Sequence, residues 1–433
     1  MTNARVLLWG SEIGAVSWLD DREIGVFQYY PDFIRSQIQL APLTMPLDNR
    51  TYSFPNLPRN TFKGLPGLLA DSLPDKYGTE IVNAWLENQG RSPSSFNSVE
   101  RLCYVGRRGM GALEFEPALL KSPDKYNTIE VEQLAELASR ILNRRQSIGG
   151  ILTGSDDRKA LEDIIRVGTS VGGARAKAIL AWNPISNEFK SGQVMVEPGF
   201  EYWILKFDGI ESFRDSELGN PKGYGKIEYA YYLMAKDIGI DMMDCRIHEE
   251  GGRSHFMTKR FDRDDNGRKV HMQSLGAIAH FDFNKQGVYS YEQAINVIKR
   301  LNLPRKDLMQ QVYRAMFNII GRNQDDHVKN ISFLMNRRGN WRLSPAFDMS
   351  YAYNESGLWT NRHQMSLNNK RDKFERKDLI DFAGFAGIKS KQANEMLDSV
   401  IETFSKWRKF AEKAKMDEES VNTIQANLRV KIK

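Results

Sequence analysis

The sequence predicts an α+β protein with two unlike halves. Before about residue 275, short apolar stretches recur with Gly, Pro and Asn between them, as strands and turns do. From about His280 onward, apolar residues recur at the three- and four-residue spacing that is typical of packed helices. The length of 433 residues suggests two or three domains of about 150 residues each. Because ligands favour clefts between such parts, we expect a site between the two halves.

The composition is ordinary for a soluble globular protein, with 41% hydrophobic and 27% charged residues. No stretch approaches the roughly 18 uninterrupted apolar residues of a membrane-spanning helix, and the first residues lack the apolar core of a signal peptide. Two cysteines, Cys103 and Cys245, are too few for a disulfide framework or a zinc knuckle. The six histidines are scattered, which argues against a transition-metal site. We therefore expect a cytoplasmic protein with no membrane contact.

Residues 1–110 are predicted to form an extra N-terminal β-rich subdomain. Its first 50 residues alternate as short strands do, with a turn expected at 10–14. The Leu-Pro-Asp sequence at 73–75 precedes a helical run and indicates a capped helix start. The predicted strands are 6–9, 15–19 and 25–29, and the predicted helix is 80–87.

Residues 111–275 are predicted to form an α+β lobe, and residues 276–433 an all-helical half interrupted by one short hairpin. The predicted helices of the α+β lobe are 131–142 and 226–239, and its strands are 178–182, 201–207, 244–248 and 255–261. The predicted helices of the second half are 291–299, 305–320, 377–385 and 390–414, and the hairpin strands are 331–335 and 341–343.

An acid, an amide and a second acid stand on loops next to this hairpin: Asp325, Asn330 and Asp348. Phosphoryl transfer from ATP uses such a set. One carboxylate orients the attacking hydroxyl and takes its proton, while the amide and the later carboxylate hold magnesium ions against the phosphates. Asn and Asp are also ordinary turn residues, so the spacing alone leaves both interpretations open.

Two features of the α+β lobe fit the same chemistry. Residues 167–178 are small, glycine-rich and basic, and glycines let backbone N–H groups approach phosphate oxygens, although an ordinary β-turn has the same composition. Lys206 stands in an apolar strand, where its ammonium group needs a partner. In a kinase this lysine holds the α- and β-phosphates and pairs with a helix glutamate, for which Glu228 is the candidate. The alternative is a strand-edge lysine that reaches solvent.

The order of these parts is the order found in a protein kinase: glycine-rich turn, strand lysine, helix glutamate, acid with an amide five residues later, then a second acid. The sequence therefore predicts a protein-kinase-like fold of two lobes. It lacks His-Arg-Asp and Asp-Phe-Gly as such, and Phe347 precedes the metal-binding acid instead of following it.

At this level of detail the chain resembles the HipA-like toxin kinases over nearly its full length. The motifs that carry the resemblance are LPDKYG at 73–78, SVGGARAK at 170–177, ILK at 204–206, KRFDR at 259–263, DDHVKN at 325–330 and PAFD at 345–348. The resemblance implies a core similar to eukaryotic protein kinases and phosphorylation of serine or threonine with ATP and Mg²⁺.

The resemblance also assigns roles to individual residues. It makes Asp325 the catalytic acid and Asn330 and Asp348 the metal ligands. It assigns ATP binding to a phosphate loop, the strand lysine, a segment at the adenine pocket and the loops around the two acids. These residues are Val171, Gly172, Gly173, Ala174, Arg175, Lys206, Lys259, Arg260, Phe261, His327, Lys329, Asn330 and Asp348.

Three positions carry more specific expectations. Ser170 matches a serine that family members autophosphorylate, which ejects the loop and silences the kinase, since a phosphoserine adds about −1.5 to −2 charge where ATP phosphates must bind. His327 matches a loop histidine that we expect to brace the catalytic loop. Asp326 is a departure, because the best-known relatives carry glycine there. An added acid should raise the local negative charge and either strengthen metal binding or perturb Asp325.

The function implied by the resemblance is the toxin of a bacterial type II toxin–antitoxin module. Its partners are a dimeric helix-turn-helix antitoxin that binds operator DNA and, as substrate, an aminoacyl-tRNA synthetase, which is of the glutamate type in the best-known case; which synthetase or other protein this chain would modify is left open. A small-molecule phosphotransferase on the same fold is the first alternative. An inactive corepressor is the second, although the intact set of Lys206, Asp325, Asn330 and Asp348 argues against it.

Direct contact with operator DNA is a weaker expectation that rests on basic residues near the C-terminus. They are Lys406, Arg408, Lys409, Lys413, Lys415, Arg429, Lys431 and Lys433. Such residues would add salt-dependent affinity for phosphates without reading bases. A solvated helix face has the same composition, and the net charge of +6 allows a DNA-binding surface without requiring one.

Overall fold

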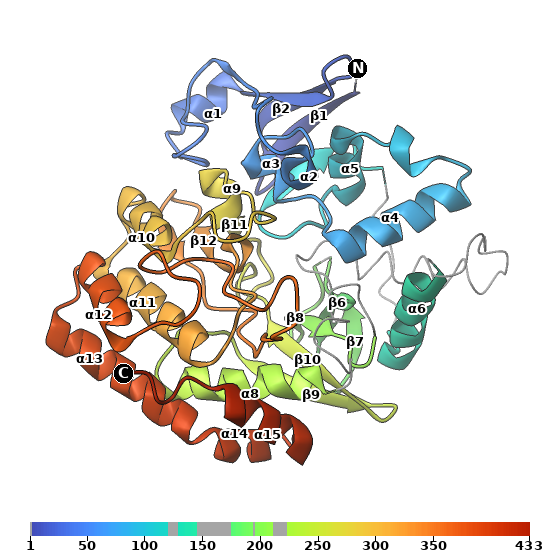
Figure 1. The fold of residues 1–433 in the computed structure, drawn as a ribbon. Helices are drawn as coiled ribbons and strands as arrows, with labels where there is room; N and C mark the ends of the chain where they lie inside the picture. Colours follow the sequence, from blue (N-terminus) through green and yellow to red (C-terminus); the bar gives the residue numbers. More distant parts are fainter. Residues whose placement is uncertain (1, 120–128, 145–174, 194, 211–222) are drawn as a thin grey trace.

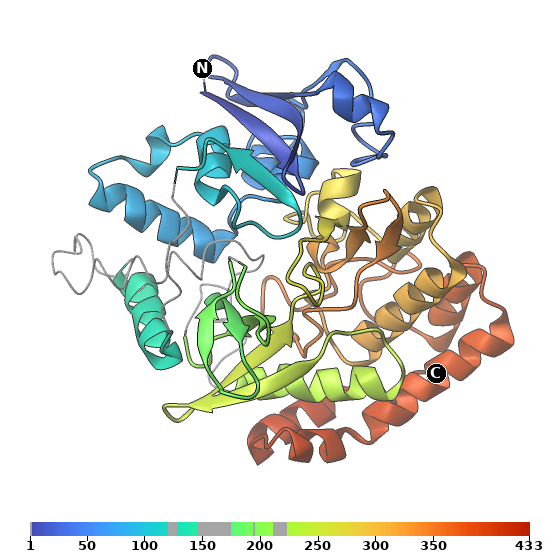
Figure 2. The same cartoon turned by 180° about the vertical axis from the view of Figure 1, so that it is seen from behind.

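The structure is a computed structural model that describes residues 2–119, 129–144, 175–193, 195–210 and 223–433. A strand-rich N-terminal part, a central sheet with two long helices, and a mostly helical C-terminal part follow one another along the chain (Figure 1). The view from behind shows the N-terminal part at the top, with the central sheet and the helical C-terminal part side by side below it (Figure 2). The predicted domain boundaries at residues 110 and 275 stay predictions.

The N-terminal part is built on an antiparallel sheet with strand order β4-β3-β2-β1-β5. Its strands are β1 (Thr2–Leu8), β2 (Ser11–Leu19), β3 (Ile24–Tyr29), β4 (Thr51–Tyr52) and β5 (Leu113–Glu116). The turn between the first two strands is shorter than the predicted 10–14, because Leu8 already pairs with Ser11. Trp9 and Gly10 form it with φ of 52° and 82°, the positive values that a two-residue hairpin turn requires.

Helices between the strands of this first sheet lead from it toward the rest of the molecule. They are α1 (Pro31–Arg35), α2 (Arg59–Phe62), α3 (Gly67–Ala70), α4 (Lys76–Asn88), the 3₁₀ helix η1 (Pro93–Ser95) and α5 (Ser98–Val105). The predicted capped start of α4 is confirmed, since the Asp75 side chain accepts a hydrogen bond from the backbone N–H of Gly78 at 2.6 Å.

The central sheet is antiparallel with strand order β7-β6-β8-β10-β9. Its strands are β6 (Lys177–Trp182), β7 (Phe189–Ser191), β8 (Glu201–Lys206), β9 (Cys245–Glu250) and β10 (Arg253–Lys259). The helix α8 (Tyr224–Asp237) packs along β9 and β10, and α6 (Val131–Arg144) lies beside α4 (Figure 1). Both helices and all four strands predicted for this region are confirmed to within a few residues.

The C-terminal part contains the predicted helices and also a small sheet, β11-β12-β13. Its strands are β11 (His271–Ser274), β12 (Ser332–Met335) and β13 (Trp341–Leu343), and its helices are α9 (Leu275–Ala279), α10 (Tyr291–Arg300), α11 (Arg305–Ile320), the 3₁₀ helix η3 (Val328–Asn330), α12 (Arg376–Phe385), α13 (Ser390–Ser405), α14 (Trp407–Lys413) and α15 (Glu418–Asn427). The helix predicted over 390–414 is two helices, because the chain departs from helical geometry at Lys406.

The largest hydrophobic core fills the C-terminal part and extends to α8. Tyr231 of α8 stacks edge-on against Phe317 of α11 and Trp407 of α14, and its hydroxyl group donates a hydrogen bond to the carbonyl of Gly321. This core fixes the end of α11, from which the polar loop with Asp325 continues. The loop is therefore presented by packed helices, as functional loops usually are.

Buried histidines make the stability of this fold depend on pH. Burial lowers the pKa of His271, in β11, to about 3, against about 6.5 in an unfolded chain. Between these values the unfolded chain binds more protons, so the free energy of unfolding falls as pH drops below about 6.5. Between pH 7.5 and 4.5, we expect the free energy of unfolding of the wild type to fall by about 2–3 kcal/mol more than that of His271→Gln. Urea denaturation at both pH values measures this difference, and parallel losses would contradict it.

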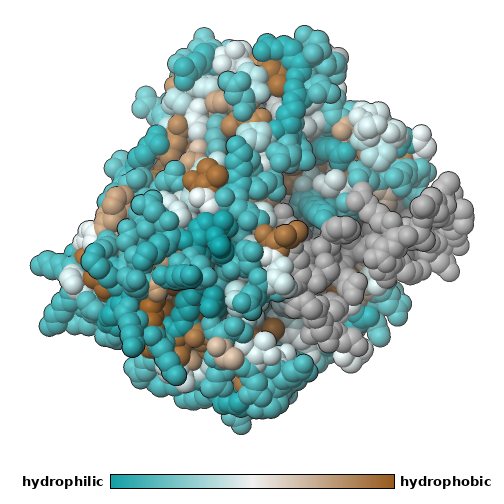
Figure 3. Space-filling model, viewed as in Figure 1, coloured by the Kyte–Doolittle hydropathy of each residue, from teal (hydrophilic) through white to brown (hydrophobic). Residues whose placement is uncertain are grey.

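No helix in the described ranges is long and apolar enough to cross a membrane. The face shown in Figure 3 is mostly hydrophilic, with hydrophobic residues in small separate groups. Some of the basic residues expected near DNA have partners within the chain: Lys406 pairs with Glu402 and Arg408 with Glu418. The expectation was wrong for Arg429, whose guanidinium group turns inward and donates to the carbonyl of Ile319 at 2.9 Å.

Candidate active site

The strand lysine and the helix glutamate form the predicted ion pair. Lys206 is the last residue of β8, and Glu228 lies in the second turn of α8. The Nζ atom of Lys206 is 2.5 Å from Oε1 of Glu228, whose residue is only 2% exposed. A buried carboxylate of this kind requires a charged partner, so the pair fixes α8 against the central sheet. The interpretation of Lys206 as a solvent-reaching strand-edge residue is wrong.

The second acid, Asp348, meets the same lysine from the other lobe. Its Oδ1 atom is 2.5 Å from Nζ of Lys206, across a sequence separation of 142 residues. Burial by itself raises the pKa of Asp348, but Lys206 and then Lys177 outweigh it and lower that pKa. Burial likewise lowers the pKa of Lys206, yet Asp348 and Glu228 raise it above its ordinary value. Asp348 and Lys206 are therefore both charged at neutral pH.

The loop after α11 carries Asp325 and Asn330, as predicted. The Asn330 side-chain nitrogen donates to the carbonyl oxygen of Asp325 at 2.9 Å, which ties the amide to the acid. Because that nitrogen is used, the amide oxygen is the atom that a cation would meet. The loop is also linked to the second acid, since the side-chain nitrogen of Asn323 donates to the Asp348 carbonyl at 3.3 Å.

Two more residues of this loop have definite contacts. The His327 ring lies 5.8 Å from the ring of Phe283, and its Nε2 atom is 3.9 Å from Oδ1 of Asp325. Its backbone N–H donates to the Asp325 carbonyl at 2.9 Å and its own carbonyl accepts from Asn330. These contacts are compatible with the predicted bracing role. Lys329 places its ammonium group 4.9 Å from the centre of the Phe283 ring.

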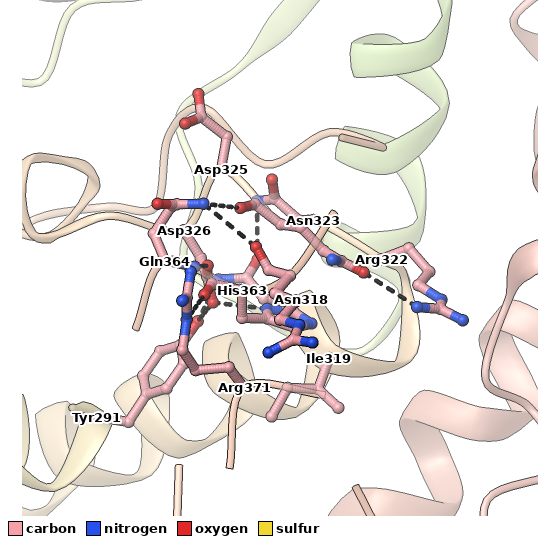
Figure 4. Close-up of polar contacts among 12 residues, drawn as sticks. Tyr291, Asn318, Ile319, Arg322, Asn323, Asp325, Asp326, His363, Gln364 and Arg371 are labelled. Atoms are coloured by element: carbon pink, nitrogen blue, oxygen red, sulfur yellow. Dashed lines mark hydrogen bonds and ion pairs between the residues drawn. The ribbon is translucent and has the colours of Figure 1, made fainter. Parts of the chain in front are cut away.

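Of the two effects expected of Asp326, direct support of metal binding was wrong, and perturbation of Asp325 stays a prediction. Its side chain is 1% exposed and points away from that of Asp325, into the protein (Figure 4). One carboxylate oxygen accepts from Tyr291 and His363, and the other accepts from the backbone N–H of Gln364. Although burial raises its pKa, these donors outweigh burial and lower it. Because this carboxylate is enclosed by its own donors, it is not available to a metal ion beside Asp325.

The other predicted ATP-binding residues have different outcomes. Ser170, Val171, Gly172, Gly173 and Ala174 lie outside the described residues. Arg175 is described, and its guanidinium group lies 3.9 Å from the centre of the Tyr224 ring.

The segment predicted to line the adenine pocket lies beside the second acid, since the ring of Phe261 is 5.4 Å from that of Phe347. Lys259 pairs with Glu201 at 2.9 Å. The Arg260 side chain is fully buried and bonds to Asp262 at 2.7 and 2.8 Å. The Arg260 side chain is therefore not available to a nucleotide, and its backbone N–H donates to the carbonyl of Tyr202 at 2.8 Å.

Models of known families match both parts of the chain. The model described as "HipA-like C-terminal domain" matches residues 169–408, and the one described as "HipA N-terminal domain" matches residues 4–116. The chain belongs to the HipA family. This confirms the family that the sequence motifs indicated.

The fold is similar to that of a solved structure described as "Shewanella oneidensis MR-1 Toxin Antitoxin System HipA, HipB and its operator DNA complex". The TM-score is 0.66 with 18% sequence identity, over 98% of this chain and 95% of the other. This likeness confirms the predicted α+β fold with its HipA-type N-terminal part. A second relative, "Putative kinase Y4mE" of Sinorhizobium fredii (strain NBRC 101917 / NGR234), is 26% identical over 125 residues. That match spans 27% of this chain and 30% of the relative.

Two residues of this HipA-family site were given no role from the sequence. Lys177 begins β6 and pairs in register with Lys206, so both side chains stand on the same face of the sheet. Its Nζ atom is 3.4 Å from Asp75, the cap of α4 in the N-terminal part, and it contributes to the lowered pKa of Asp348. The sequence feature that could have indicated a role for Lys177 is its position between the glycine-rich segment and a strand. Asp75 is a long-range contact that no local pattern indicates.

Proposed function

We propose that this protein is a serine/threonine protein kinase that uses ATP and Mg²⁺ and acts as the toxin of a bacterial type II toxin–antitoxin module. The observation that carries the proposal is the meeting of Lys206, Glu228 and Asp348 at the junction of two lobes, with the Asp325–Asn330 loop tied to Asp348. Structural ion pairs alone do not require an exposed acid and a tethered amide beside them. Phosphoryl transfer requires both.

Each group has a defined part in this proposal. Lys206 holds the α- and β-phosphates, and Glu228 keeps its ammonium group in place. Asp348 and the Asn330 amide oxygen suit Mg²⁺, which prefers oxygen ligands and keeps some water and phosphate oxygens in its shell. The acceptor hydroxyl oxygen forms a bond to the γ-phosphorus as the bond to the ADP oxygen breaks, and Asp325 takes the hydroxyl proton. Bound Mg²⁺ would neutralise charge on the phosphates.

The relatives support the wider assignment. The Shewanella protein was solved with HipB and operator DNA, and the Sinorhizobium relative is described as a kinase. By the same logic we assign this chain a dimeric helix-turn-helix antitoxin, operator DNA bound through that complex, and a cytoplasmic place of action. We propose that the acceptor is a protein serine, of an aminoacyl-tRNA synthetase such as glutamate–tRNA ligase, and that Ser170 is an autophosphorylation site.

Mass spectrometry after incubation with ATP and Mg²⁺ tests the proposal. We expect one phosphate on Ser170 in the wild type and none in Asp325→Asn. Ser170→Ala is expected to stay active and to be more toxic in cells, because it cannot add the charge that repels ATP phosphates. ATP binding without phosphate on any protein would contradict a protein kinase and favour a small-molecule acceptor or a corepressor.

A further inference from the structure

Two neighbouring acids of the catalytic loop face opposite sides of it. The side chain of Asp325 is 42% exposed and faces the candidate active site, whereas that of Asp326 is 1% exposed and faces the protein interior (Figure 4). A buried carboxylate is costly unless donors satisfy it, so its surroundings must be built for it. The donors around Asp326 therefore show what the buried acid holds in place.

Asp326 binds a segment that lies more than 30 residues further along the chain. From this segment, Nδ1 of His363 donates to the carboxylate at 2.8 Å and the backbone N–H of Gln364 donates at 2.7 Å. A third donor is the hydroxyl group of Tyr291, at 2.7 Å, which precedes Asp326 in the chain. The Nε2 atom of His363 accepts in turn from Arg429 at 2.8 Å. Burial lowers the pKa of His363, so the ring is neutral and bridges the carboxylate and the guanidinium group.

The segment anchored in this way returns to the active site at Trp359. The Gln364 side chain donates to the carbonyl of Trp359, and the Gln324 side chain donates to the carbonyl of Thr360 at 3.2 Å. The indole Nε1–H of Trp359 then donates to Oδ1 of Asp325 at 2.6 Å. One acid of the loop therefore anchors the segment 359–364, and the segment in turn holds the other acid.

We propose that Trp359 is a positioning residue for Asp325 and that Asp326 keeps Trp359 in reach of it. The inference rests on the proposed kinase function and adds a residue outside the loop to its catalytic machinery. A hydrogen bond from an indole to a carboxylate is charge-assisted, so it fixes the side chain more firmly than a neutral bond would. With Oδ1 held by Trp359, Oδ2 is the oxygen turned to the acceptor hydroxyl. Trp359 acts through Asp325 and takes no part in holding the nucleotide.

The kinetic test compares Trp359→Phe with Trp341→Phe. The first variant keeps an aromatic ring but loses the donor to Asp325. The second is a matched control, because the Trp341 indole donates to the carbonyl of Gln39 at 3.1 Å, away from the site. We expect Trp359→Phe to lower kcat about tenfold, with unchanged affinity for Mg-ATP and an acceptor KM within about twofold. The control should match the wild type.

Asp326→Asn tests the anchoring step. The variant keeps the size of the side chain but places an amide donor among three groups that donate to the carboxylate. We expect its kcat to fall at least as far as that of Trp359→Phe, and the double variant to be no slower than Asp326→Asn alone, because both changes remove the same contact. If the two losses of kcat multiplied in the double variant, the anchoring role of Asp326 would be overturned. Normal kcat in Trp359→Phe, or a loss matched by weaker Mg-ATP binding, would overturn the positioning role.

A spectroscopic test does not depend on kinase activity. The full-length protein with ¹⁵N-labelled tryptophan gives an indole N–H signal for Trp359, which Trp359→Phe identifies by its absence. We expect Asp325→Asn to move this signal and to speed its exchange with solvent, because the charged acceptor is lost. An unmoved signal would overturn the proposed contact. If the signal moves but the wild-type protein transfers no phosphate, the contact is supported and the proposed kinase function is contradicted.

Discussion

Asp325→Asn is expected to lower the rate of phosphoryl transfer by about 100- to 10,000-fold, the range typical for loss of a general base. The affinity for Mg-ATP should stay within about threefold of the wild type. The reason lies in the geometry. Asp325 bonds to Trp359 and, through its backbone, to Asn330, whereas the ion pairs of the site join Lys206 to Glu228 and Asp348. An amide of the same size leaves those ion pairs intact but cannot accept the hydroxyl proton.

Asp348→Asn is the matched comparison, because the same atom exchange is made at the other acid. This carboxylate bonds to Lys206 and suits Mg²⁺, so we expect Mg-ATP affinity to fall about 10- to 100-fold along with the rate. Isothermal titration with Mg-ATP and single-turnover phosphoryl transfer separate binding from chemistry. Equal losses of affinity in both variants would contradict the separate roles of the two acids.

Much of the scaffold of this site could be predicted from local sequence. The helix predicted over 305–320 is found as α11 with the same ends, because its apolar residues recur at helical spacing and Gly321 closes it. The strands predicted at 331–335 and 341–343 are found as β12 and β13 for an equally local reason: turn-forming residues separate two apolar runs.

The Lys206–Glu228 pair was predictable for a different reason. A buried lysine must find a carboxylate, and the order of parts offered one candidate. The pair thus required a physical constraint as well as a local pattern.

Other parts of the site depend on contacts that local sequence does not contain. Nothing in the Asp325-Asp326 dipeptide says which acid faces solvent; Tyr291, His363 and the backbone of Gln364 decide it, from distant positions in the chain. The bond from Trp359 to Asp325 and the reach of Asp75 to Lys177 are of the same kind. Arg429 looked like one more surface cation because charge patterning does not reveal that the chain end folds back under the loop.

The second large effect is expected on stability, in variants of the central ion pair. Lys206→Met should lower the free energy of unfolding by about 3–5 kcal/mol, because it leaves Glu228 and Asp348 without their shared cation in a poorly solvated place. Glu228→Gln should cost less, about 1–2 kcal/mol, because Lys206 keeps Asp348 as a partner. The pKa of Lys206 is raised in the folded state. Its contribution to the free energy of unfolding is therefore present throughout the neutral pH range and is lost only as the pH rises through this raised pKa.

The double variant decides whether these losses come from the pair itself. Removing the cation and neutralising the glutamate together leaves fewer buried charges without a partner, so Lys206→Met with Glu228→Gln should be more stable than Lys206→Met alone. Urea denaturation of the four proteins gives the coupling free energy, which we expect to be about 1–3 kcal/mol. Losses that simply add would mean that α8 is held by its apolar contacts with the core. In that case the ion pair would add no coupling free energy to the fold, and its role would be to bind phosphate, so Mg-ATP affinity would still fall in Lys206→Met.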